Sequence, residues 1–377
     1  MLHKGVSDVI TLLISSSLLV LFGLITLYSF DAIDGEEGLY FFWRQAIFAC
    51  FAFGVAFFMF RLSYRALQMA STQLYFLALG VLLFVILFGD TVRGTAGWID
   101  FGLFRVQPVE IVKIILILFL ASFFVSKRNQ FGDIGKIIVS FFLVFFLVGL
   151  VLMQPDFGSA VILVGIWAGM LFVSDMKTKY VFILLGLAIF VAGSSWFVLE
   201  DYQKDRIMVT INPEIDAQGS GYNVIQSMIA IGSGGITGKG IGNGSQSQLL
   251  FLPEHHTDFI FASIVESLGF IGAIFLLVLY GILLHRISSI AMTAGDSFGF
   301  LVASGVYVML LVQIIINIGM NIGIVPVTGI PLPLLSYGGS SLVATAMGLG
   351  MVANIAYYKR FFSLHRETDS LDGGDIS

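Results

Sequence analysis

The chain has 377 residues, of which 58% are hydrophobic and only 11% are charged, and its mean hydropathy is +0.97. Charged residues normally make up about 25% of a soluble domain. The composition therefore excludes a soluble globular protein and predicts a membrane protein whose side chains face lipid. The net charge of −5 argues against nucleic acid as a partner. The one cysteine, Cys50, lies in an apolar run, which excludes a disulfide framework or a cysteine metal cluster.

Ten stretches are apolar and long enough to cross a bilayer, which takes about 20 mainly apolar residues. They cover residues 9–30, 42–60, 74–89, 108–126, 137–153, 158–174, 180–199, 259–284, 298–323 and 338–358. The first stretch is longer than the apolar core of a signal peptide, so we expect it to be a span rather than a cleaved leader. The sequence predicts an all-α integral membrane protein with about ten transmembrane helices.

The basic residues orient these helices. With a cytoplasmic N-terminus, the inner connections hold 12 of the 19 Lys and Arg residues, the outer side holds six, and Lys113 lies within a span. The positive-inside rule then places both termini in the cytoplasm, as an even number of helices requires. Residues 1–362 are predicted to form a single membrane domain. The polar tail, residues 363–377, is expected to be disordered in the cytoplasm.

Two long connections lie on the predicted outer side, residues 90–107 and residues 200–258. Connections above about 12–15 residues are usually functional or disordered. The second connection, between the seventh and eighth helices, contains seven glycines from Gly232 to Gly244. A phosphate-binding P-loop is excluded, because that motif needs Gly where Ser233 stands and Ser or Thr where Gly240 stands. A loop that wraps a polar substrate fits this pattern better.

Two charged residues interrupt the fourth span. Glu110 and Lys113 stand three residues apart and share one helical face. Ionisable side chains within a membrane face the bundle interior or a water-filled cavity. Either the two residues form a neutralised structural pair, or Lys113 directs a positive charge into a substrate cavity.

Other polar residues lie in the last three spans. Gln313, Asn317 and Asn321 recur every four residues, and such a stripe often only joins helices. Glu266 lies two turns into the eighth span and is expected to face inward. The stretch "PLPLLSYGGSS" (331–341) offers backbone donors for an anionic group at the start of the tenth helix, although a plain N-capping turn has a similar sequence.

The stretch "FLPEHHTDFIF" (251–261) places polar residues directly before the eighth span. Asp258 suits a helix N-cap, since Asp is a preferred capping residue. A zinc site with His255 and His256 is a weaker interpretation, because adjacent histidines point in different directions and no fourth ligand is evident. The third interpretation is a carboxylate held at the membrane surface as a base or as a ligand of a hard cation.

Four stretches together resemble the SEDS family of shape, elongation, division and sporulation proteins. They are "QPVEIVK" (107–113), "QPDFGSA" (154–160), "GKGIGNGSQSQLLFLPEHHTDFIFASIVESLGFIG" (238–272) and "NIGMNIGIVPVTGIPLPLLSYGGSS" (317–341). The resemblance covers nearly the whole chain and is closer to the elongation branch, RodA, than to the division branch, FtsW. The chain departs from the family pattern at Gly97, where an arginine usually precedes the tryptophan, and at Val109, where the family usually has serine.

The resemblance implies a peptidoglycan glycosyltransferase of the bacterial cytoplasmic membrane, with its active site on the extracytoplasmic side. Such an enzyme polymerises lipid II into glycan strands during elongation and rod-shape maintenance, inverts the sugar configuration and releases undecaprenyl pyrophosphate. The implied partner is a class B penicillin-binding protein. A lipid II flippase and a non-catalytic scaffold of the wall-synthesis complex are the alternative functions.

The resemblance also implies roles for individual residues. The essential aspartate of the family corresponds to Asp258, which we expect to act as the catalytic base or as a ligand of a divalent cation, Mg²⁺ or Mn²⁺. Lys113 matches the family motif of the fourth span and is a candidate substrate-binding cation. The other candidate substrate-binding residues are Arg44, Glu110, Lys239, Ser336, Gly338, Gly339 and Ser340. No nucleotide is expected, because the pyrophosphate bond of lipid II supplies the energy.

Overall fold

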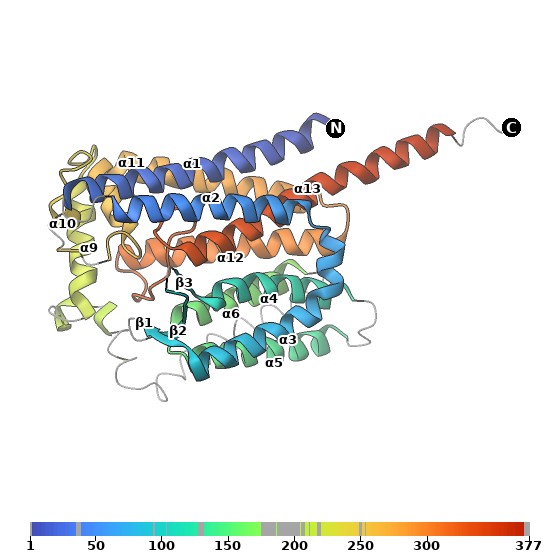
Figure 1. Cartoon of the computed structure of the whole chain (residues 1–377), viewed down its shortest axis with the longest axis horizontal. Helices are drawn as coiled ribbons and strands as arrows, with labels where there is room; N and C mark the ends of the chain where they lie inside the picture. The colour runs from blue at the N-terminus through green and yellow to red at the C-terminus, as the bar shows by residue number, and fades with distance from the viewer. Residues whose placement is uncertain are drawn as a thin grey trace.

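The computed structural model describes residues 2–34, 39–92, 95–102, 104–126, 132–174, 186, 204, 208–210, 212–216, 220–248, 251–252 and 254–372. Long apolar helices run side by side, and a small sheet lies at one end of them (Figure 1). The helices are α1 (Leu2–Asp34), α2 (Tyr40–Arg61), α3 (Tyr64–Phe88), α4 (Pro108–Val125), α5 (Asp133–Leu152), α6 (Phe157–Val173), η1 (Pro213–Asp216), α9 (Ser220–Gly234), α10 (Ser245–Gln248), α11 (Ile260–Met292), α12 (Ser297–Asn321) and α13 (Gly339–Asp372). The strands are β1 (Asp90–Val92), β2 (Thr95–Asp100) and β3 (Arg105–Val106).

In the part of the chain that the structure describes, eight helices are long and apolar enough to span a membrane, and α6 is apolar but shorter. These nine helices coincide with nine of the ten predicted spans, which confirms an all-α multi-pass membrane protein. The predicted seventh span, residues 180–199, lies outside the described residues apart from Gly186. The tail that was expected to be disordered from Ser363 continues α13 as helix to Asp372.

Burial separates the central helices from those that face lipid. Within their apolar windows, 72% of the residues of α4 and of α12 and 78% of those of α13 are buried, against 11% for α2. On α2, large aromatic side chains such as Phe51 and Phe53 are more than 60% exposed. A helix that exposes such side chains is stable only where the surrounding medium is apolar. The core of the bundle is therefore built by α4, α12 and α13.

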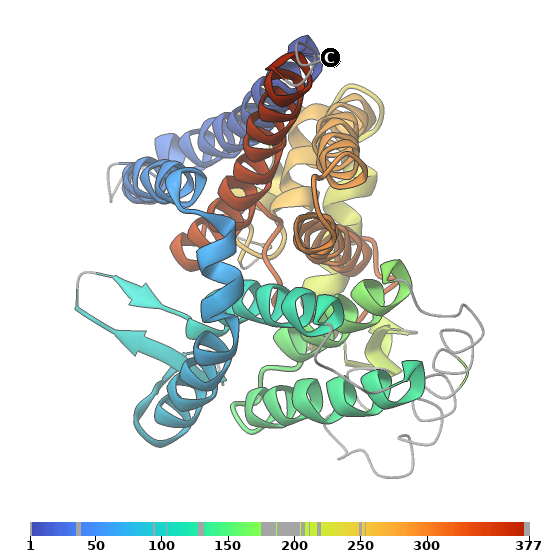
Figure 2. The same ribbon diagram turned by 90° about the vertical axis from the view of Figure 1, so that its right-hand side faces the viewer.

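The two ends of the bundle differ. Both chain termini lie at one end, and α9, α10 and the sheet lie at the other (Figure 1). The connection that holds residues 90–107 forms a three-stranded antiparallel sheet in the order β1-β2-β3, with Asp90 paired to Trp98 and Ile99 to Val106. Our reading of the sequence assigned no strands there. The sheet extends sideways from the bundle (Figure 2).

A break interrupts α11 at Gly269, whose backbone angles (φ 66°, ψ −163°) are not helical. The glycine-rich segment 235–240 lies against this break. Lys239 N donates to Glu266 O at 3.0 Å, Gly240 N donates to Ser267 O at 3.0 Å, and Phe270 N donates to Gly235 O at 2.9 Å. Since lipid offers no hydrogen-bond partners, an interrupted helix needs such bonds from the protein itself. The glycine-rich segment thus completes α11.

Substitution of Gly269 by alanine is expected to destabilise the protein by about 3 kcal/mol. Its backbone conformation is open essentially to glycine only, and a methyl group would lie 2.3 Å from Gly238 N. Thermal unfolding of the purified protein in detergent measures the effect. The control is Gly281→Ala on the same helix, where a methyl group meets nothing within 4 Å. Equal melting temperatures for the two variants would contradict this account of the break.

Candidate functional site

The candidate site centres on the turn formed by residues 254–259, directly before α11. Asp258 is partly exposed in this turn, and Phe259 occupies the N-cap position of α11. The N-cap interpretation of Asp258 is therefore wrong: the helix starts one residue too late for it. The turn lies at the end of the bundle opposite the chain termini (Figure 1).

Two buried asparagines of α12 hold the main chain of this turn. The amide nitrogens of Asn317 and Asn321 each donate to Asp258 O at 3.0 Å. The side-chain oxygen of Asn321 accepts from Ala262 N at 3.0 Å, in the first turn of α11. Both asparagines have no exposed surface. The polar stripe of α12 thus fixes the position of Asp258 in addition to joining helices.

The connection between α12 and α13 holds the other side of the turn. Ser336 Oγ donates to Thr257 O at 2.6 Å and accepts from Leu332 N at 2.9 Å. Tyr337 N donates to His256 O at 2.9 Å. The predicted site residues Asp258 and Ser336 therefore lie in adjoining segments, and Ser336 acts on the main chain next to the carboxylate.

Gln45 links this connection to α2, a helix on the outside of the bundle. Its Nε2 donates to Ser336 O at 3.1 Å, and its Oε1 accepts from Gly338 N at 3.2 Å. Gln45 is 2% exposed. Sequence reasoning missed this residue, whose only signal was a polar side chain next to Arg44 within the predicted span 42–60.

Arg44 lies beside the same turn through Tyr337. The Arg44 guanidinium hydrogen-bonds the hydroxyls of Tyr337 and Tyr40. Burial raises the pKa of the Tyr337 hydroxyl above its ordinary value, and the positive charge of Arg44 opposes that shift. The hydroxyl therefore stays protonated to a higher pH than that of an ordinary tyrosine. The structure therefore places the predicted cation Arg44 next to Tyr337, which is hydrogen-bonded to the turn that contains Asp258.

The start of α13 is anchored on both flanks. Gly339 lies so close to the Phe48 ring that an added Cβ would be 3.0 Å from it. Ser340 Oγ accepts from Gln107 N, the residue before α4, at 3.0 Å. Gly338 N is bonded to Gln45, as described above. These contacts give Gly338, Gly339 and Ser340 structural roles at the helix start, and their predicted role toward an anion stays a prediction.

Glu110 and Lys113 form a buried ion pair in α4. Lys113 Nζ donates to Glu110 Oε1 at 2.7 Å, and the two side chains are 1% and 5% exposed, lysine first. This contact agrees with the first of the two interpretations of their spacing, a neutralised structural pair. Its predicted part in substrate binding stays a prediction.

Lys239 is paired at a different place, beside the break in α11. Its Nζ donates to Glu266 Oε1 at 3.0 Å and to Ser245 Oγ at 2.9 Å. The Lys239 side chain is 29% exposed, whereas that of Glu266 has no exposed surface. Glu266 faces inward, as expected from its position in the span.

The histidines of the turn pack against aromatic rings. His255 lies edge-on to Phe30 with ring centroids 4.8 Å apart, and His256 lies on Phe41 at 4.2 Å. Among the residues that the structure describes, no group of three or more His, Cys, Asp or Glu side chains is placed to hold a metal ion. A cation on Asp258 would take its other ligands from main-chain oxygens, water or the substrate phosphates.

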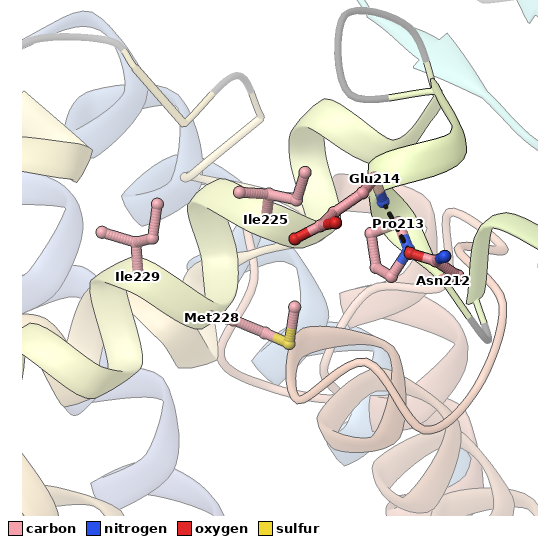
Figure 3. Close-up of a pocket in the computed structure, with 6 residues that line it drawn as sticks. All are labelled: Asn212, Pro213, Glu214, Ile225, Met228 and Ile229. Atoms are coloured by element: carbon pink, nitrogen blue, oxygen red, sulfur yellow. Dashed lines mark hydrogen bonds between the residues drawn. The ribbon is translucent and has the colours of Figure 1, made fainter.

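A cavity of about 390 Å³ lies elsewhere, between η1 and α9. Figure 3 shows the polar side chains of Asn212, directly before η1, and of Glu214 on η1, together with the apolar side chains of α9. It is lined by Asn212, Pro213, Glu214, Ile225, Met228 and Ile229. None of the residues predicted from the sequence is among them, so this cavity is separate from the candidate site.

Comparison with known proteins adds an independent result. A protein-family model for cell cycle proteins, FTSW_RODA_SPOVE, matches residues 9–361. The chain is 40% identical over 291 residues to the peptidoglycan glycosyltransferase MrdB of Escherichia coli K12, covering 77% of this chain and 78% of that protein. It is 37% identical over 369 residues to the stage V sporulation protein E of Bacillus subtilis, covering 96% and 100%.

Solved structures agree with these sequence matches. A chain from a peptidoglycan synthase complex that coordinates polymerization and crosslinking is similar with a TM-score of 0.78 at 29% identity, covering 92% of this chain and 97% of that one. The rod shape determining protein RodA of Thermus thermophilus is similar with a TM-score of 0.68 at 28% identity, covering 92% and 96%. The fold described here is thus shared with these proteins.

Substitution of Asn321 by leucine is expected to lower the free energy of unfolding by about 2–3 kcal/mol. It removes the acceptor of Ala262 N and one donor to Asp258 O, and a buried polar group without a partner costs about 1–3 kcal/mol. The control is Gln313→Leu on the same stripe, because the buried Gln313 Oε1 has no hydrogen-bond partner in the described part of the chain. Denaturant unfolding should separate the two variants. Similar losses in both would show that the stripe acts only as packing.

Proposed function

The chain belongs to the FtsW, RodA and SpoVE family of cell cycle proteins, and from this membership we propose that it is a peptidoglycan glycosyltransferase that polymerises lipid II. The curated relatives that carry this activity in their names support the assignment. The similarity to the rod shape determining protein RodA supports a role in elongation and rod-shape maintenance rather than in division. The protein is a multi-pass membrane protein. We place it in the cytoplasmic membrane with the end that carries Asp258 facing outward.

The proposed mechanism depends on the hydrogen bonds that hold the main chain at Asp258. Its main-chain oxygen accepts two hydrogen bonds from α12, and the two residues before it are held through their oxygens by Ser336 and Tyr337. Carboxylates that act on a substrate need a fixed position, because misplacement by about 1 Å can cost 10²-fold in rate. The backbone of this aspartate is rigidly held while its side chain remains partly exposed.

The chemistry requires one base. The donor sugar is bound to pyrophosphate through an α-linkage and becomes β-1,4-linked in the product, so a single displacement inverts its configuration. The acceptor hydroxyl oxygen forms a bond to the anomeric carbon as the bond from that carbon to the pyrophosphate breaks. The hydroxyl proton passes to the Asp258 carboxylate, and the pyrophosphate leaves with the bonding electrons. No nucleotide takes part.

The departing pyrophosphate needs positive charge. Lys113 and Lys239 are each paired with a buried carboxylate. The Arg44 guanidinium donates to two tyrosine hydroxyls next to the turn that contains Asp258. Because of this position we assign the leaving group to Arg44 first, and to Lys113 only after rearrangement of its ion pair.

A class B penicillin-binding protein is the proposed partner. The structural neighbour is part of a peptidoglycan synthase complex that joins polymerization to crosslinking. A glycan strand made on the outer surface of the membrane is the substrate that such a crosslinking enzyme uses.

Substitution of Asp258 by asparagine is expected to lower the rate of lipid II polymerisation by about 10²–10⁴-fold, the range for loss of a general base. The assay is glycan-ladder formation by the purified protein with its class B partner. Asp296→Asn at the other end of α12 is the control and should retain the rate within about threefold. Equal ladders from wild type and Asp258→Asn would refute the catalytic role. The absence of ladders from an intact wild-type complex would favour the flippase.

Removal of divalent cations distinguishes the two roles proposed for Asp258. If the carboxylate holds a cation on the pyrophosphate, EDTA abolishes polymerisation and added Mg²⁺ or Mn²⁺ restores it. If the carboxylate acts only as a base, the wild-type rate in EDTA stays within about twofold. We expect EDTA to abolish polymerisation and the added cation to restore it, because a pyrophosphate leaving group carries more negative charge than one arginine neutralises. An unchanged rate in EDTA would leave Asp258 as a base alone.

A further inference from the structure

Asp258 and Glu266 lie at the two ends of one short helical segment. The break at Gly269 separates residues 260–268 from the rest of α11. Asp258 stands two residues before this segment, and Glu266 lies near its end. A short helix bounded by a turn and a break can shift as a unit, since no continuous helix fixes its direction. Its position must therefore be set by other contacts.

Glu266 provides the strongest of these contacts. Its carboxylate has no exposed surface, and Oε1 accepts from Lys239 Nζ at 3.0 Å, from Gln246 N at 2.9 Å and from Ser245 Oγ at 3.4 Å. A buried charge is stable only with such partners. The segment 239–246 is thus bound to the helix that follows Asp258.

The same segment also leads to the turn that contains Asp258. Gln246 O accepts from Leu252 N at 3.0 Å. Leu252 is fully buried in a cluster with Phe259 and Ala262, and Leu252 O lies 3.2 Å from His255 Nδ1. Contacts from Glu266 therefore reach the catalytic turn along the loop as well as along the helix.

We propose that Lys239 and Glu266 are positioning residues for the reaction: their ion pair sets the placement of the short helix 260–268 and hence of the Asp258 carboxylate. The inference rests on the proposed function, because it assumes that Asp258 reacts. Lys239 then acts on the enzyme rather than on the substrate. This differs from a direct contact with the pyrophosphate, and the two roles give different results in experiment.

Three variants test the proposal. Lys239→Met removes the charge and retains the length of the side chain, and Lys239→Arg keeps the charge. The matched control is Arg286→Met, which breaks the ion pair to Asp8 (2.9 Å) at the other end of α11. The Arg286 side chain is 31% exposed, and that of Lys239 is 29% exposed. All variants are assayed as the full chain with its class B partner.

The first measurement is steady-state kinetics with lipid II. We expect Lys239→Met to lower kcat by about 10²-fold with KM within about threefold, since misplacement by about 1 Å costs that much. Lys239→Arg and Arg286→Met should keep both parameters within about threefold. Wild-type kcat in Lys239→Met would overturn the proposal.

The second measurement is amide hydrogen exchange over residues 254–262, which does not depend on activity. Exchange there should become about tenfold faster in Lys239→Met and stay unchanged in Arg286→Met. A lower kcat without faster exchange would overturn the proposal and assign Lys239 to the substrate. If the wild-type complex makes no glycan, the proposed function fails. Hydrogen exchange still decides whether the ion pair holds the turn.

Discussion

One constraint underlies this structure: within a bilayer, main-chain N–H and C=O groups must find partners inside the protein. Three non-helical segments meet that demand: the turn 254–259, the connection between α12 and α13, and the glycine-rich segment 235–240. The turn 254–259 is held by α12 and by the connection to α13. The segment 235–240 pairs with the break in α11. The irregular backbone around Asp258 is thus held by several buried polar side chains.

The buried charges follow the same logic. Glu110 and Lys113 neutralise each other within α4, and Glu266 is neutralised by Lys239 with the help of main-chain and hydroxyl donors. Removal of one partner from the Glu110–Lys113 pair would leave a buried charge and be strongly destabilising. Asp258 differs in burial, because the residue is partly exposed while its main chain is held. This difference supports the catalytic role that we propose for Asp258.

Several features were predictable from the sequence. Apolar run length locates nine helices of the described chain, since about 20 apolar residues are needed to cross a bilayer. The motif around residues 254–261 predicted a role for Asp258, and that role stays a prediction. By contrast, Gln45 and Tyr337 were missed as site residues, because their partners lie in distant segments of the chain and nothing in the local sequence marks such contacts. The strands of residues 90–106 were also missed, because the stretch was assigned only as a connection.

The sequence alone determined the fold class, the family and the residue types available for chemistry, because hydropathy and local motifs are written along the chain. Only the tertiary structure decided which of those residues act together. It paired Lys239 with Glu266 and placed Arg44 beside the turn that contains Asp258 through Tyr337. It also turned the stripe of Asn317 and Asn321 into the support of Asp258. These contacts join residues about 30 to 290 positions apart, and such pairings depend on helix packing rather than on spacing along the chain.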